Sequence, residues 1–131
     1  MSFRQKTAKY FSNHAETSEN HIDPTLQTHY YKTTRDKGLS LLENHFNNNE
    51  SYHINAISKG HGEISATIIK GKKAFVVATV IMVRPYQTAI DFSVTTESVL
   101  PFDLGYSTKI IQQLYQQVNK ELPIINNTNR R

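Results

Sequence analysis

The segment Lys73-Ala-Phe-Val-Val-Ala-Thr-Val-Ile-Met-Val83 is the most apolar run in the chain, and it determines the expected fold. Its β-branched residues favour a pleated strand over a helix. The run has the length of a strand and not of a membrane-spanning helix. Successive side chains of a strand point to opposite faces of the sheet, and both faces are apolar here. One face carries Ala74, Val76, Ala78, Val80 and Met82. The other face carries Phe75, Val77, Thr79, Ile81 and Val83. We therefore expect a central strand that is covered on both sides.

Short turns around this run predict an antiparallel meander. Apolar and polar residues alternate with the period of a strand in the segments before and after it. These segments are residues 52–57, 63–70 and 88–95, with a further short strand expected at 28–32. Tight turns at Gly71 and at Pro85 join the last three strands, so neighbouring strands should pair in sequence order.

Two apolar stripes predict helices. Leu39, Leu42 and Phe46 share one face of a helix over residues 35–46, and Ser107 can cap a second helix that Pro123 ends. The second stripe consists of Ile110, Ile111, Leu114, Val118 and Leu122. Two helices on one face of a four- to five-stranded meander give an α+β two-layer sandwich. We expect one shared core formed by Leu39, Leu42, Phe46, Val76, Ala78, Val80, Ile90, Phe92, Ile110, Leu114 and Val118.

The length of 131 residues indicates a single domain. We assign residues 1–28 to an irregular N-terminal arm that partly packs on the domain, 29–122 to the domain, and 123–131 to a flexible tail. The chain has no cysteine, which excludes disulfides, thiolate zinc sites and cysteine nucleophiles. No apolar signal segment follows Met1, so we expect a cytoplasmic protein without a membrane partner.

The net charge of +4 is dispersed along the chain. No predicted element carries a basic stripe, and the cationic turn at residues 70–73 suits a solvated hairpin tip that protects the sheet edge. Nucleic acid is therefore not an expected partner.

Residues 90–111 carry a resemblance to a known family. They read Ile-Asp-Phe-Ser-Val-Thr-Thr-Glu-Ser-Val-Leu-Pro-Phe-Asp-Leu-Gly-Tyr-Ser-Thr-Lys-Ile-Ile. This segment resembles the end of the uncharacterised bacterial domain-of-unknown-function family numbered 1499, in which a strand with Asp and Ser leads to Asp-Leu-Gly and a final helix. The matching residues are Asp91, Ser93, Asp103, Leu104 and Gly105, whereas an arginine and an asparagine usual in that family are absent. The resemblance covers under a fifth of the chain and implies a bacterial α+β protein without known chemistry.

The same segment holds the candidate ligand-binding residues Asp91, Ser93, Asp103 and Gly105. Asp103 precedes a helix, where a carboxylate either accepts backbone N–H groups or contacts a ligand at the rim of the loop. Asp91 needs a partner within hydrogen-bond reach to act as an acid or base, and the sequence identifies none.

The histidines predict no metal site. His53, His61 and Glu63 lie on neighbouring strand ends, but their spacing matches no established zinc motif. We expect neither a metal nor a cofactor.

The second face of the central strand suggests how the protein functions. Phe75, Val77, Ile81 and Val83 need a cover, which a second copy of the chain, a small apolar ligand or the N-terminal arm can supply. Ile57 and Ile69 extend this patch if their strand registers hold. A twin subunit covers two patches at once, so we expect a homodimer through this face. The expected function is a non-catalytic binding or interaction module; the alternative is a small enzyme that uses Asp91, Asp103 or a histidine on a substrate in a groove.

Overall fold

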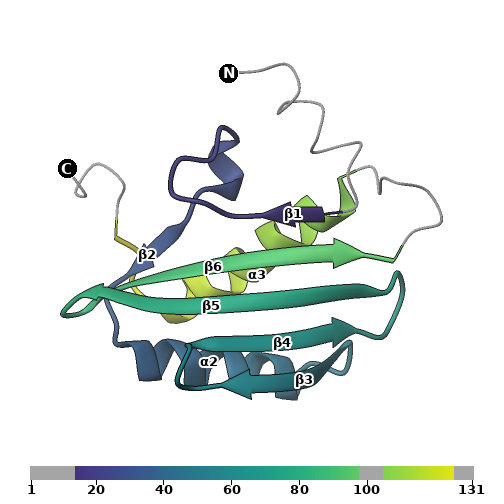
Figure 1. The fold of residues 1–131 in the computed structure, drawn as a ribbon, viewed down its shortest axis with the longest axis horizontal. Helices are drawn as coiled ribbons and strands as arrows, with labels where there is room; N and C mark the ends of the chain where they lie inside the picture. Colours follow the sequence, from purple (N-terminus) through teal and green to yellow (C-terminus); the bar gives the residue numbers. More distant parts are fainter. Residues whose placement is uncertain (1–13, 98–104, 126–131) are drawn as a thin grey trace.

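The apolar run forms β5 (Ala74–Arg84), the central strand of a single antiparallel sheet (Figure 1). The computed structural model describes residues 14–97 and 105–125. β5 lies between β4 (Glu63–Ile68) and β6 (Gln87–Thr96), and β3 (Tyr52–Ser58) pairs with the far side of β4. The predicted meander of four antiparallel strands is therefore confirmed.

Two short strands pair with the outer edge of β6. β2 (His29–Tyr31) confirms the short strand expected at 28–32, whereas β1 (His14–Glu16) and the 3-10 helix η1 (Pro24–Leu26) were not predicted. The flexible tail was expected to begin at Pro123. Instead the backbone N–H of Lys32 donates to the Pro123 carbonyl, and the Ile125 N–H donates to the Tyr30 carbonyl. The ordered part of the chain therefore extends at both ends beyond the predicted domain.

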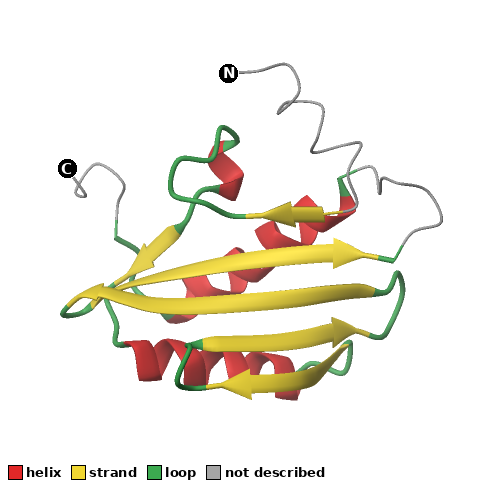
Figure 2. Ribbon diagram, viewed as in Figure 1, coloured by secondary structure: helices red, strands yellow, loops and turns green. Residues whose placement is uncertain are grey.

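Both helices pack on the same side of the sheet (Figure 2). α2 (Arg35–Asn48) begins after Thr34, whose hydroxyl accepts from the Lys37 N–H at 3.3 Å. α3 (Tyr106–Glu121) begins after Gly105, which adopts a left-handed conformation with φ of 85°. Ser107 was expected to cap this helix, but it lies buried within the first turn because the helix starts two residues earlier than that cap implies. The α+β sandwich with two helices on one face is confirmed.

The core lies between the helices and one face of the sheet. All eleven residues expected to share it are buried there in one cluster. Tyr31, Ile64 and Ile111 are also fully buried in this cluster.

The other face of β5 is exposed in the single chain. Phe75 is 46% exposed and Ile81 is 51% exposed. Both helices pack on the opposite side, and the cover expected for this face, from a second copy, a ligand or the N-terminal arm, stays a prediction. We call the uncovered side the open face.

Candidate functional site

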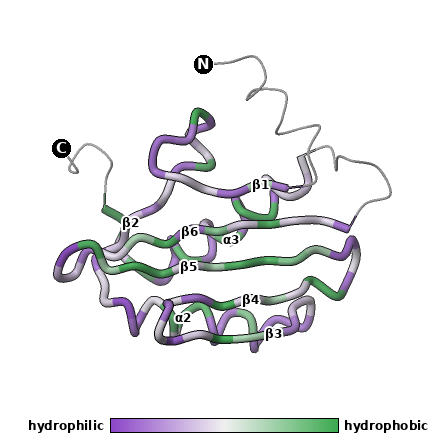
Figure 3. Tube along the Cα trace, in the orientation of Figure 1, coloured by the Kyte–Doolittle hydropathy of each residue, from purple (hydrophilic) through white to green (hydrophobic). Residues whose placement is uncertain are grey.

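The open face is an apolar stripe with polar borders. The strand register places Phe75, Val77, Thr79 and Ile81 along its centre, and Figure 3 shows hydrophobic colouring along most of β5. Small neutral side chains lie directly opposite Phe75 and Val77 on the adjacent strands. These neighbours are Ser65 and Thr67 on β4 and Ser93 and Thr95 on β6.

Three of the four predicted interface residues share this face. Phe75, Val77 and Ile81 are in register on it, but the pairing of β5 with β6 shifts between Met82 and Arg84. Val83 lies at this shift in register, so the strand pairing does not assign its side chain to either face of the sheet. It is 49% exposed.

Ile57 does not extend the patch. The pairing of β3 with β4 shifts between Ile54 and Ala56, which leaves Asn55 as an extra residue. A bulge of this kind reverses the alternation of side chains beyond it. Ile57 therefore pairs with Ile64 on the helix side of the sheet, while Ala56 takes the place on the open face. Ile69 is 56% exposed but follows the end of β4.

Asp91 connects β6 to the N-terminal segment. Its Oδ1 accepts hydrogen bonds from the hydroxyls of Thr17 and Thr28, each at 2.6 Å. The Thr17 hydroxyl oxygen also accepts from the Phe92 N–H at 3.0 Å. These contacts give Asp91 two hydrogen-bond partners that the sequence analysis did not identify. Both occupy Oδ1, one of the two carboxylate oxygens.

The four candidate ligand-binding residues do not form one described site. Asp91 and Ser93 lie on β6, where Ser93 pairs with Val77 and Glu16. Gly105 caps α3 in the helix layer. Asp103 lies outside the described residues, so its predicted role stays a prediction.

Among the histidines on the sheet, His14 lies near an acidic residue, with its Nε2 3.7 Å from Oε1 of Glu16. Nδ1 of His61 lies 2.8 Å from the Ser58 hydroxyl, and His53 is exposed on β3. Within residues 14–97 and 105–125, no group of three His, Cys, Asp or Glu side chains could hold a metal ion.

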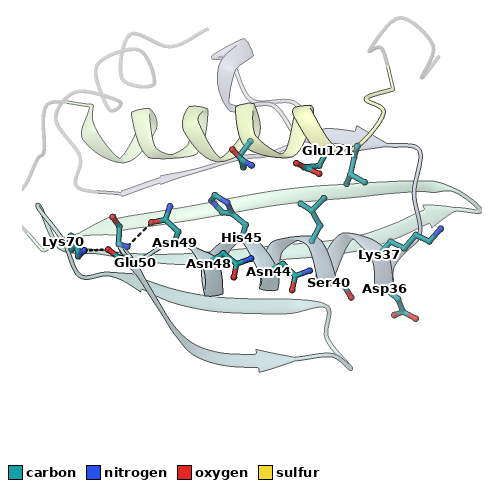
Figure 4. Close-up of a pocket in the computed structure, with 14 residues that line it drawn as sticks. Asp36, Lys37, Ser40, Asn44, His45, Asn48, Asn49, Glu50, Lys70 and Glu121 are labelled. Atoms are coloured by element: carbon teal, nitrogen blue, oxygen red, sulfur yellow. Dashed lines mark hydrogen bonds and ion pairs between the residues drawn. The ribbon is translucent and has the colours of Figure 1, made fainter.

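A groove of about 960 Å3 lies between α2 and α3, on the helix side of the molecule (Figure 4). We call it the interhelical groove. The sequence analysis did not predict it. The α2 side of the groove is lined by Asp36, Lys37, Ser40, Leu41, Asn44, His45 and Asn48. One end is bordered by Asn49, Glu50, Ser51 and Lys70, and the remaining lining residues are Gln117, Glu121 and Leu122. Lys70 and Glu50 form an ion pair at 2.9 Å.

His45 lies at the centre of this groove. In Figure 4 its side chain rises from α2 toward α3. Its ring packs against those of Phe46 and Tyr52, with centroids 5.6 and 6.0 Å away. Burial lowers the pKa of His45 below its usual 6.5, so the imidazole is neutral at pH 7.

His45→Gln is expected to weaken the pH dependence of stability. The lowered pKa means that the unfolded chain binds a proton at His45 more readily than the folded chain does. The favourable contribution is therefore full above the unfolded pKa of about 6.5 and is lost as the pH falls through the lower folded pKa. Urea unfolding between about pH 7.5 and pH 5 should show a smaller loss in His45→Gln than in the wild type.

A matched substitution tests that explanation. Asn44→Gln replaces the preceding groove residue without removing a titratable group, and it should keep the wild-type pH profile. Identical profiles for His45→Gln and the wild type would contradict the role given to His45.

Comparison with protein-family models, with curated proteins and with solved structures finds no match. The resemblance to the family numbered 1499 therefore stays a prediction. Among the described residues, neither helix is long and apolar enough to cross a membrane.

Proposed function

We propose that this protein is a non-catalytic interaction module whose open face binds a second copy of the chain. The observation that carries the proposal is the register of Phe75, Val77 and Ile81, which aligns three apolar side chains on one uncovered face. Large exposed apolar patches are uncommon on monomers and mark sites of association. A cytoplasmic location, as expected from the sequence, is part of the same proposal.

The size of the open face allows a small dimer interface. The four meander strands give a width of ~19 Å at the usual strand spacing. The strands have 7, 6, 11 and 10 residues, which gives a mean length of ~28 Å. The product is ~530 Å2, below the ~800 Å2 that each partner buries in a standard interface.

The distribution of polar groups supports the same partner. Serines and threonines flank Phe75 and Val77, whereas the carboxylates of Glu63 and Asp91 flank Thr79 on the same face. Protein interfaces are depleted of charge at the centre, so the segment around Phe75 and Val77 is the part of the face that suits a contact core. A two-fold contact also covers both copies of the patch at once.

The catalytic alternative has less support from the described residues. Both hydrogen bonds to Asp91 Oδ1 come from threonine hydroxyls that hold the N-terminal segment. Asp103 lies outside the described residues, within which no group of three His, Cys, Asp or Glu side chains could hold a metal ion.

Val77→Lys is expected to convert the dimer to a monomer. The substitution places a charge next to Phe75 on the apolar stripe, where the proposed dimer would bury it. Light scattering of the wild-type chain should report twice the chain mass, and Val77→Lys should report one chain mass. Gln113→Lys adds the same charge on an exposed position of α3 and should leave the dimer intact.

Two outcomes would overturn the dimer. A wild-type chain that remains monomeric at ~100 µM lacks the affinity that the proposal requires. If the wild type is monomeric and the NMR signals of Phe75 change when residues 1–13 are removed, the face belongs to the N-terminal arm instead.

A further inference from the structure

The interhelical groove contains side chains whose hydrogen-bonding groups are not used within the described structure. Asn44 and Asn48 lie one turn apart on α2, His45 follows Asn44, and Gln117 lines the groove from α3. In the described parts of the chain, no hydrogen bond to these four side chains is found. By contrast, Asn49 at the groove end accepts the Ser51 N–H at 2.9 Å.

These side chains can both donate and accept hydrogen bonds. Each amide offers two N–H donors and a carbonyl acceptor. A neutral imidazole donates from one ring nitrogen and accepts at the other. The half-buried position of His45 keeps it neutral in the groove. Hydroxyl groups, which also donate and accept at the same atom, are the matching partners.

The charges of the groove argue against an anionic ligand. Lys37 and Lys70 are outnumbered by Asp36, Glu50 and Glu121, which leaves a formal charge of −1 when +2 and −3 are added with His45 neutral. The whole chain carries +4, so the groove is locally acidic in a basic protein. A phosphate or carboxylate ligand would meet a net negative charge there.

We propose that the interhelical groove binds a neutral saccharide. Its amides and the imidazole face ring hydroxyls, while Leu41 and Leu122 offer apolar surface to the C–H groups of a sugar ring. The volume of about 960 Å3 accommodates an oligosaccharide of a few units and lies within the usual range of ligand sites. The groove lies on the helix side, so saccharide binding is independent of association through the open face.

NMR titration of the 15N-labelled full chain with maltotriose and with diacetylchitobiose tests this site. At least one of the two should produce saturable shifts centred on Asn44, Asn48 and Gln117. Asn48→Ala and Gln117→Ala should each weaken binding about fivefold, as expected from the loss of one hydrogen bond. Inorganic phosphate should produce no saturable shift in the groove.

The chain provides matched controls for both variants. Asn47 and Gln116 are exposed neighbours on the same two helices and do not line the groove. Asn47→Ala and Gln116→Ala should bind saccharide as the wild type does. If neither saccharide shifts the groove residues at ~50 mM, or if the groove and control variants bind equally, the proposal is wrong.

Discussion

Phe92→Ala is expected to lower the free energy of unfolding by about 3–5 kcal/mol. Phe92 is 1% exposed and lies opposite Ala78 on β5. Its ring meets the ring of Tyr115 on α3 edge to face, with centroids 5.0 Å apart. Truncation removes this contact and leaves a cavity between sheet and helix. The sheet and α3 cannot close that cavity without losing other contacts. The free-energy cost of the cavity therefore adds to the cost of the lost burial.

Phe75→Ala provides the matched comparison. It removes the same atoms from the open face, where the side chain is 46% exposed, and should cost less than about 1 kcal/mol. Both substitutions should be measured by urea unfolding in a Val77→Lys background, which is expected to keep the proteins monomeric. Equal costs at the two positions would mean that the faces of the sheet are wrongly assigned.

Gly62→Ala is expected to destabilise the fold by about 2–4 kcal/mol. Gly62 has φ of 67° in the turn between β3 and β4, a conformation that L-residues with a side chain rarely adopt. A Cβ atom there would lie well under 3.0 Å from the Val80 carbonyl oxygen and 3.0 Å from Nε of Arg35. The Gly62 carbonyl accepts the Val80 N–H at 2.7 Å, so the turn cannot move away without losing that bond.

Two other glycines separate the backbone-strain and the steric contributions to the cost of Gly62→Ala. Gly71 has φ of 79° but open space around it, so Gly71→Ala should cost about 1 kcal/mol from backbone strain alone. Gly60 has neither a left-handed φ nor a neighbour within 4 Å, and Gly60→Ala should change stability by less than about 0.5 kcal/mol. Thermal or urea unfolding should rank the three variants in this order. An equal effect at Gly62 and Gly71 would exclude the steric contribution of Val80.

The parts of the fold predicted from the sequence depend on local periodicity. Leu39, Leu42 and Phe46 repeat with a helical period, and the alternation in β6 places Ile90 and Phe92 on one side of the strand. Such patterns are properties of short segments, and burial follows once each apolar face packs against another. The core and the layer arrangement were accordingly predictable.

The features that could not be predicted depend on distant partners. Asn55 carries no local sign of a bulge, because its place as the extra residue is set by pairing with β4. Asp91 finds Thr17 and Thr28 at sequence separations of 74 and 63 residues. The interhelical groove was missed because Asn44 and Asn48 on α2 look like a solvated helix surface until α3 is placed beside them. The clustering of amides around His45 was the one signal available.

The edges of the sheet determine which assemblies the protein avoids. β3 forms one edge and is interrupted by the bulge at Asn55, while β1 and β2, of three residues each, cover the outer side of β6. Bulges and very short strands are poor templates for strand addition between molecules. Edge-to-edge growth into a continuous fibre is therefore disfavoured, and the isologous contact proposed for the open face would close after two chains.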